Sequence, residues 1–234
     1  MATLFLFDID GTILTFKHYR SREIFSDMIY KLFNKRVMFE NLPNFAGMTD
    51  LQILREIATE INHPFDEIEK KIEEIWGNML PEFKKHTNEE HIVLMPGIQK
   101  LLDYLNNCEN VSLGLCTGNF RENAYLKLSV FDLGRYFPYG AFGNDHEDRN
   151  LLPPVAVNRA NKYMENGSFD NTNTIIVGDS PRDIECAKVN NMQCIITCTG
   201  HFIRDDLSAL DPDHLLDDFD DFEYTKKIFN NYMN

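Results

Sequence analysis

Residues 3–12 read TLFLFDIDGT, a short apolar run followed directly by two carboxylates and a glycine. An uninterrupted apolar run of this length is typical of a strand that is covered on both faces of a parallel sheet. Three later runs, 111–116, 174–177 and 194–198, have the same character. Helical periods separate these later runs, so the sequence predicts an α/β fold with a doubly wound parallel sheet.

Residues 17–91 break this alternation of strands and helices. They show no convincing strand pattern but at least three amphipathic helical periods, whose apolar stripes fit the core of a helical bundle. Thr49 with Gln52 three residues later is a capping-box pattern and predicts that the second helix begins there. We therefore expect an α-helical segment, 17–91, inserted into an α/β core formed by 1–16 and 92–234.

The composition excludes several classes of protein. The 234 residues carry 23 Lys and Arg against 37 Asp and Glu, a net charge of −14, which disfavours nucleic acids and anionic membranes as partners. No stretch reaches the roughly 18 to 20 apolar residues that span a bilayer, and residues 1–7 lack the basic start of a signal peptide. The five cysteines form no CxxC pair, so reduced, buried thiols are favoured over a zinc site or redox pair. We expect a cytoplasmic monomer or dimer.

Polar side chains follow three of the predicted strands. Asp8 and Asp10 follow the first, Thr117-Gly118-Asn119 follow the second, and residues 178–183, which read GDSPRD, follow the third. Any one of these segments alone is compatible with an ordinary turn or helix cap. Together they converge on one site, because ligands in open α/β sheets bind at the carboxyl ends of the strands. Neighbouring carboxylates repel unless a cation or proton lies between them, and oxygen-only ligands favour Mg²⁺ over Ca²⁺ or Zn²⁺.

The three motifs, DIDGT at 8–12, TGN at 117–119 and GDSPRD at 178–183, resemble those of the haloacid dehalogenase-like hydrolases in order and placement. The resemblance covers nearly the whole chain, because the inserted helices fit the α-helical cap of that family. The layout is similar to the branch that contains phosphoglycolate phosphatases and β-phosphoglucomutases. The resemblance implies a Rossmann-like core and, as ligand, a small phosphorylated metabolite.

The resemblance also implies catalytic and metal-binding roles. Asp8 would be the nucleophile that forms an aspartyl-phosphate, and Asp10 would protonate the leaving oxygen and then deprotonate the attacking water. Mg²⁺ would be held by the Asp8 carboxylate, the main-chain carbonyl of Asp10 and Asp179. Asp183 would support the metal directly or through another ligand.

The phosphate-binding residues follow the family pattern except at one position. Thr117 and the amide of Gly118 would donate hydrogen bonds to the phosphoryl oxygens. The family also expects a lysine at the start of a later helix, but the matching stretch here reads DRNLLP and contains Arg149 instead. A guanidinium is permanently charged and binds phosphate in a bidentate way, so Arg149 is our candidate. The alternatives are that Arg149 is a surface charge, or that Arg159 or Lys162 takes this role.

The loop before the second predicted helix is a candidate for substrate selection. Gly47, Met48 and Thr49 resemble the cap loop that reads the leaving group, although they also fit a simple helix N-cap, and one loop can serve both purposes. Four polar residues past the first strand either contact substrate or belong to the ordinary surface: His18, Tyr19, Arg20 and Arg22.

These observations predict a Mg²⁺-dependent phosphatase that hydrolyses a small phosphomonoester. Asp10 favours phosphoryl transfer over dehalogenation, because a halide leaving group needs no acid. A phosphosugar mutase of the same fold is the nearest alternative, and a non-catalytic domain that binds a phosphorylated ligand is a third. The presence of both Asp8 and Asp10 favours catalysis over mere binding. The sequence leaves the identity of the phosphomonoester open.

Overall fold

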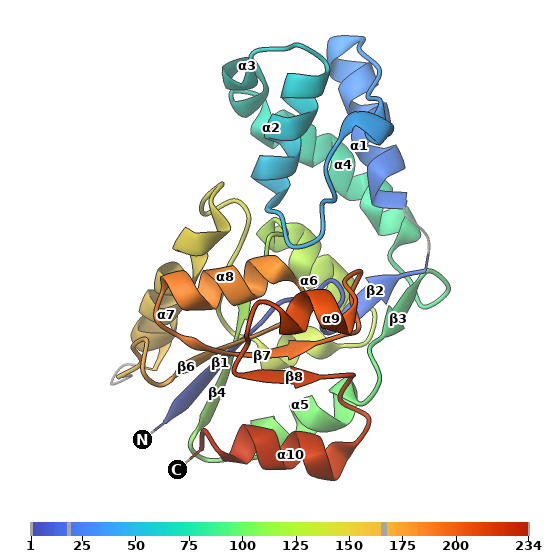
Figure 1. Ribbon diagram of the computed structural model, residues 1–234. Coiled ribbons are helices and arrows are strands. Elements are labelled where there is room, and N and C mark those ends of the chain that lie inside the picture. Colours follow the sequence, from blue (N-terminus) through green and yellow to red (C-terminus); the bar gives the residue numbers. More distant parts are fainter. Residues whose placement is uncertain (1, 18–19, 165–167, 234) are drawn as a thin grey trace.

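The core of the structure is a parallel sheet with helices on both faces, as Figure 1 shows. The computed structural model describes residues 2–17, 20–164 and 168–233. The strands of the sheet are β1 (Thr3–Phe7), β4 (Val111–Cys116), β5 (Gly140–Ala141), β6 (Thr174–Gly178), β7 (Gln193–Thr197) and β8 (His214–Leu216). Within the described residues these six strands are all parallel and lie in the order β5-β4-β1-β6-β7-β8. The predicted doubly wound fold is therefore confirmed.

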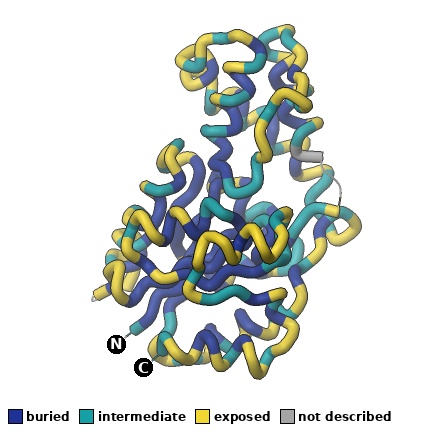
Figure 2. The backbone as a smooth tube through the Cα atoms, in the orientation of Figure 1, coloured by how far each residue is buried: buried dark blue, intermediate teal, exposed yellow. Residues whose placement is uncertain are grey.

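The central strand β1 is apolar throughout because both of its faces are covered. Leu4 and Leu6 belong to one apolar cluster, and Phe5 and Phe7 belong to another. Helices α5 (Ile98–Asn106), α6 (Arg121–Ser129) and α10 (Phe222–Asn230) pack into the cluster of Phe5. Helices α7 (Leu152–Tyr163), α8 (Pro181–Val189) and α9 (Arg204–Ser208) pack into the cluster of Leu4. Figure 2 shows the buried chain concentrated along the central strands between these helices.

The sequence pattern did not reveal the short strands. β5 is 2 residues long and β8 is 3, so neither offers enough positions for a recognisable period. The strands β2 (Leu14–Phe16) and β3 (Ile92–Leu94) form a separate antiparallel pair, with Phe16 opposite Ile92. This pair holds the two ends of the helical insertion side by side.

The insertion consists of α1 (Arg20–Phe33), α2 (Asp50–Glu60), α3 (Phe65–Glu69) and α4 (Ile72–His86), which we call the inserted helices. They enclose an apolar cluster of their own, which includes Ile29, Leu54 and Ile75. The Thr49 side chain accepts a hydrogen bond from Gln52 N (3.1 Å), so the predicted start of the second helix is confirmed. The division of the chain into 1–16 with 92–234 and 17–91 stays a prediction.

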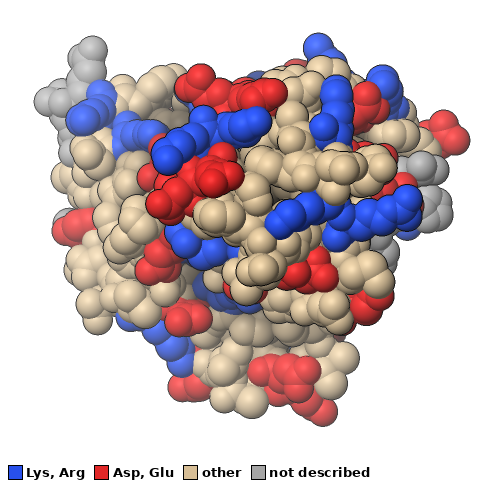
Figure 3. All heavy atoms as spheres, turned by 90° about the horizontal axis from the view of Figure 1, so that it is seen from above, with Lys and Arg blue, Asp and Glu red and all other residues tan. Residues whose placement is uncertain are grey.

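Short 3₁₀ helices complete the description: η1 (Phe39–Asn41), η2 (Leu133–Tyr136) and η3 (Arg149–Leu151). Across the described residues, every helix is too short or too polar to cross a membrane. All five cysteines lie in described segments and carry free thiols, and Cys116, Cys186 and Cys194 are buried. Seen from above, on the side of the inserted helices, basic and acidic side chains lie next to one another (Figure 3).

Candidate active site

The three polar strand ends meet at one edge of the sheet. β1 lies between β4 and β6, so the residues that follow these strands are neighbours in space. Asp8, Asp179 and Asp183 are all buried, and one carboxylate oxygen from each lies within 4.8 Å of the others. The structure thus brings together carboxylates that are far apart in the sequence.

Asp8 lies at the centre of this group. Its Oδ1 accepts a hydrogen bond from Ile9 N (2.7 Å), and its Oδ2 lies 3.1 Å from Nη2 of Arg149. Burial raises the pKa of Asp8 from its ordinary 3.8 to about 6, although the Arg149 charge and a hydrogen bond from Thr117 oppose this effect. A carboxylate so poorly solvated would gain from a further positive charge nearby.

Asp179 is fixed by a close approach of the backbone. A Cβ atom on Gly11 would lie 2.4 Å from Asp179 Oδ2, and Gly11 has a φ of +87°, which side chains rarely adopt. Thr12 Oγ1 donates a hydrogen bond to Asp179 Oδ1 (2.8 Å). Burial, followed by the charges of Asp183 and Asp8, raises the pKa of Asp179 well above its ordinary value. Gly11 of the DIDGT motif is therefore required for the carboxylate group to assemble.

Asp183 organises the loop between β6 and α8. Its Oδ2 accepts hydrogen bonds from Ser180 N (3.0 Å), Ser180 Oγ (2.6 Å) and Asp179 N (3.3 Å), which forms a capping box at the start of α8. Its Oδ1 accepts a hydrogen bond from Arg149 Nη2. Asp183 thus positions both the Asp179 loop and the guanidinium of Arg149.

Arg149 is buried and connects the carboxylates to the inserted helices. Besides Asp8 and Asp183, its Nη2 contacts the carbonyl of Cys116 (3.3 Å), and its Nη1 donates to the carbonyl of Gly47 (3.1 Å). Burial alone would lower the pKa of Arg149, but the charges of Asp183 and Asp8 outweigh it and raise that pKa well above its ordinary value. Arg149 therefore stays charged beside the candidate nucleophile.

The two alternative cations lie elsewhere. Arg159 is paired with Asp145, with N–O distances of 2.5 and 2.6 Å, and also donates to the carbonyl of Gly140 (2.8 Å). Lys162 is exposed on α7. Of these cations it is Arg149 that contacts Asp8.

The donor set fits a hard divalent cation. The three buried carboxylates carry three negative charges and the Arg149 guanidinium carries one positive charge, so the group has a net charge of about −2 when all are ionised. Buried charge of one sign is unfavourable unless a group of opposite charge lies beside it. The available ligands are oxygen atoms only, which suit Mg²⁺. A dication at this position would neutralise the buried group.

Asp10 is held by a network that the sequence analysis missed. Lys127 Nζ lies 2.7 and 2.6 Å from the two carboxylate oxygens of Asp10 and donates to Asn119 Oδ1 (2.6 Å). Asn119 Nδ2 donates in turn to Asp10 Oδ2 (2.7 Å) and to Thr117 Oγ1 (2.8 Å). The second aspartate of the motif is therefore tied to the TGN segment and to α6.

The sequence did not indicate a role for Lys127, because α6 has no continuous apolar stripe that would show which of its faces is buried. Asn123 and Lys127 are both buried and share the inward face of this helix with Ala124 and Leu128. The available signal was the four-residue spacing of Asn123 and Lys127, which puts both on one face of the helix, with Asn119 four residues earlier in the segment before it.

The loop before α2 packs directly on the TGN segment. A Cβ atom on Gly118 would lie 2.0 Å from the carbonyl oxygen of Met48, and Asp50 N donates to the carbonyl of Gly118 (2.8 Å). Thr49 Oγ1 donates to the carbonyl of Glu147 (2.7 Å), which belongs to the core side. Glycine at position 118 therefore permits the inserted helices to close on the sheet edge.

A cavity of about 140 Å³ lies between this sheet edge and the inserted helices. Asp8, Asp10 and Arg149 line it on the side of the sheet, and the rest of the lining includes Phe16, Phe25, Phe45, Gly47, Met48, Asp50, Ile53, Phe83, Gly118, Asn119, Asn123 and Lys127. Arg22 packs over the ring of Phe45, 5.3 Å from its centroid. His18, Tyr19 and the side chain of Arg20, which were considered above as substrate contacts, lie outside the described part of the chain.

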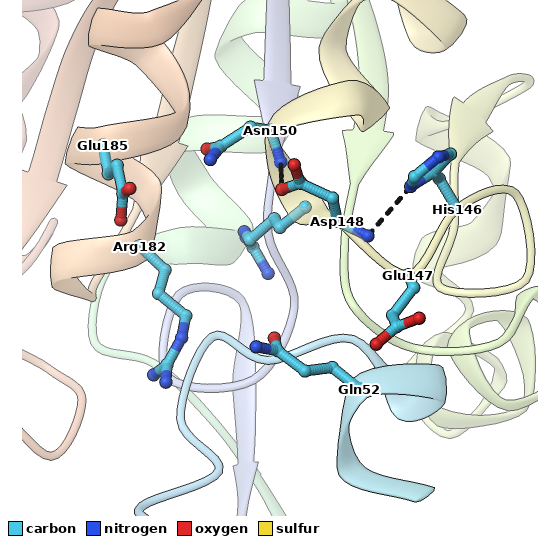
Figure 4. A pocket seen from close by; sticks show the side chains of 8 residues that line it. Gln52, His146, Glu147, Asp148, Asn150, Arg182 and Glu185 are labelled. Carbon is cyan, nitrogen blue, oxygen red and sulfur yellow. Dashed lines mark hydrogen bonds between the residues drawn. The ribbon is translucent and has the colours of Figure 1, made fainter. Parts of the chain in front are cut away.

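A second pocket, of about 310 Å³, lies on the other side of Arg149. Figure 4 shows that its side chains come from α2 (Gln52), from the segment 146–150 and from α8 (Arg182 and Glu185). Arg182 Nη1 donates to the carbonyl of Ala46 (2.6 Å), so this pocket also borders the loop before α2. Both linings mix acidic and basic groups, but it is the smaller cavity that contains Asp8 and Asp10.

Comparison with known proteins agrees with the motifs and the fold. Residues 5–197 match the family model described as haloacid dehalogenase-like hydrolase. A phosphoglycolate phosphatase from Pseudomonas fluorescens (strain Pf0-1) is 23% identical over 222 residues, which cover 93% of this chain and 77% of the relative.

Several solved structures share the fold at low sequence identity, and two of them illustrate the likeness to this chain. The β-phosphoglucomutase from Clostridium difficile superposes with a TM-score of 0.72 at 19% identity and covers 99% of both chains. CbbY from Rhodobacter sphaeroides, in complex with phosphate, superposes with a TM-score of 0.67 at 19% identity and covers 95% of this chain and 96% of its own. With the family model spanning most of its length, this chain belongs to the haloacid dehalogenase-like hydrolases.

Proposed function

We propose that this hydrolase is a Mg²⁺-dependent phosphatase that acts on a small phosphomonoester through an aspartyl-phosphate. The observation that carries the proposal is the position of Asp8, which is buried at the end of the central strand between Arg149 and two further carboxylates. A relative named phosphoglycolate phosphatase supports the same class of reaction.

In the first step, Asp8 attacks the phosphorus atom and the leaving alcohol departs with a proton from Asp10. Arg149 binds the phosphoryl oxygens, together with the Thr117 hydroxyl and the Gly118 amide. Asp8, the Asp10 carbonyl and Asp179 would hold Mg²⁺, supported by Asp183. When bound, this ion supplies positive charge that lets an anionic nucleophile approach an anionic substrate.

In the second step, water attacks the phosphorus atom of the aspartyl-phosphate. Asp10, now a carboxylate, accepts the proton of that water, and Asp8 and inorganic phosphate are released. Lys127 and Asn119 keep the carboxyl group of Asp10 directed into the cavity in both steps.

We also infer that residues 17–91 act as a cap over a core formed by 1–16 and 92–234. Gly47, Met48 and Thr49 then read the leaving group. Met48 and Gly47 line the cavity, and the Thr49 side chain anchors the loop to the core. A closed cap excludes bulk water from the reacting phosphoryl group.

The proposal is tested by acid-quenching the enzyme during turnover with Mg²⁺ and measuring its intact mass. We expect a species heavier by one phosphoryl group, mapped to Asp8, which is missing in Asp8→Asn. Turnover of Asp8→Asn at the wild-type rate contradicts the covalent mechanism. Analysis of products separates a phosphatase, which releases inorganic phosphate, from a phosphosugar mutase, which returns an isomer.

A further inference from the structure

The donors at one end of the cavity, which is lined by Asp10, Asp50, Asn119, Asn123 and Lys127 and which we call the leaving-group end, are already used. An ammonium group has three N–H donors, and Lys127 directs them to Asp10 Oδ1 (2.7 Å), Asp10 Oδ2 (2.6 Å) and Asn119 Oδ1 (2.6 Å). The other cation that lines the cavity, Arg149, is held by Asp8 and Asp183 on the side of the sheet. Among the described lining residues, neither cation is therefore free to bind a second anionic group of the substrate.

The orientation of the neighbouring amides follows from Lys127. Because an ammonium only donates, the oxygen of Asn119 must face it, and that oxygen also accepts from Asn123 Nδ2 (3.3 Å). Asn123 Oδ1 is consequently turned away, and in the described structure it is buried without a hydrogen-bond partner. Because this oxygen has almost no accessible surface, Asn123 lines the cavity without offering that acceptor to a ligand.

Asp50 provides an acceptor and a negative charge. It is buried, it lines the cavity, and its Oδ2 accepts a hydrogen bond from Phe120 N (2.7 Å), which leaves Oδ1 for a ligand. Burial raises the pKa of Asp50 from 3.8 to about 6, so a cation beside it would offset the cost of its charge. When Asp10 carries the proton that it donates in the first step, Asp50 and Lys127 leave this end of the cavity without a net charge, and Asp50 Oδ1 is the local acceptor for an ammonium group.

The remaining wall is largely aromatic. Phe16, Phe25, Phe45 and Phe83 line the cavity, and aromatic faces attract ammonium groups. The volume of the cavity is about 140 Å³. It therefore accommodates a phosphoryl group and a short carbon chain.

We propose that the leaving group is a short amino alcohol, so that the substrate is a small phosphomonoester with an ammonium group that binds Asp50 within the ring of phenylalanines. This inference rests on the proposed phosphatase function and specifies its substrate class. A substrate whose leaving group ends in a carboxylate, such as phosphoglycolate, would place an anion against Asp50 and is disfavoured.

The test compares three two-carbon phosphomonoesters: phosphoethanolamine (cationic), 2-hydroxyethyl phosphate (neutral) and phosphoglycolate (anionic). Their affinities are measured by calorimetry with Mg²⁺ on the Asp8→Asn variant, which removes the nucleophile and so avoids turnover. We expect phosphoethanolamine to bind roughly tenfold more tightly than the neutral ester, and phosphoglycolate to bind most weakly.

Adding Asp50→Asn tests the residue itself, because asparagine keeps an acceptor for Phe120 N but loses the charge. The preference for phosphoethanolamine over the neutral ester should then fall about tenfold. Asp66→Asn is the matched control: it removes an exposed carboxylate from the first turn of α3, outside the cavity, and should leave the preference unchanged.

The inference is overturned if phosphoglycolate binds more tightly than phosphoethanolamine, if none of the three binds, or if Asp50→Asn leaves the preference intact. Failure of the proposed function is a separate outcome. It would appear as binding in the expected order while the wild-type enzyme releases no phosphate from any of the three esters or from acetyl phosphate.

Discussion

Replacing Lys127 by Met would test the role of the ion pair with Asp10. The substitution keeps most of the side-chain volume but removes all three hydrogen bonds of Nζ, which span 2.6 to 2.7 Å. Loss of one partner from a fully buried pair costs about 3–5 kcal/mol, whereas an exposed pair contributes about 0–1 kcal/mol. The Lys127 side chain is 7% exposed and that of Asp10 is 43% exposed. We therefore expect a stability loss of about 1–2 kcal/mol, since water can solvate the remaining carboxylate.

The effect of Lys127→Met on catalysis should exceed its effect on stability. Asp10 would keep its hydrogen bond from Asn119 Nδ2 (2.7 Å) but lose the group that fixes both of its oxygens. General acid–base catalysis contributes about 10²- to 10⁴-fold, so a misplaced Asp10 should lower kcat roughly 10²-fold. An alkyl phosphate should lose more rate than p-nitrophenyl phosphate, because the aryl leaving group needs less protonation.

The assay measures phosphate release from both esters, together with urea unfolding of the same preparation. Lys100→Met serves as a control, because Lys100 is an exposed lysine on α5. Near-normal kcat for both esters in folded Lys127→Met would refute the positioning role. An equal loss for both would show that Lys127 does not act through the acid.

Four further results are expected. Arg149→Ala should lower kcat/KM by an amount equivalent to about 2–4 kcal/mol, whereas Arg159→Ala, which removes a cation outside the cavity, should leave kcat/KM nearly unchanged. If steady-state kinetics show the larger loss for Arg159→Ala, then Arg149 does not bind the phosphoryl group. Chelation by EDTA should stop phosphate release, and Mg²⁺ should restore it better than Ca²⁺; persistent activity after dialysis would remove the metal from the mechanism. Gly118→Ala should lower the free energy of unfolding by about 1–3 kcal/mol, because its Cβ would lie 2.0 Å from the carbonyl oxygen of Met48. Thermal unfolding should show a lower midpoint, and phosphate release should fall as well. Burial raises the pKa of Asp50 to about 6, so its contribution to stability is complete below 3.8 and is lost as the pH rises through about 6. The Asp50→Asn variant cannot ionise at this position. Its free energy of unfolding, relative to that of the wild type, should therefore rise by up to about 3 kcal/mol between about pH 4 and pH 8. Urea unfolding that shows the same difference between the two proteins at both pH values would contradict this.

The sequence by itself determined the central sheet and the DIDGT motif that follows its first strand. Both signals are local: an apolar run with carboxylates directly after it reports a doubly buried strand and the chemistry at its end. The inserted helices were recognisable for the same reason, since their apolar stripes repeat with the helical period. β5 and β8 were not recognised, because two or three residues carry no period.

Only the tertiary structure decided which groups surround the two aspartates. Lys127 lies 117 positions from Asp10 in sequence, and Arg149 lies 102 positions from Gly47, yet each pair is in hydrogen-bond contact. These contacts depend on which face of α6 turns toward the sheet edge and on how closely the loop before α2 approaches Gly118. Such choices are set by the packing of whole helices on a sheet, where a polar residue facing inward interrupts the apolar pattern that sequence analysis relies on.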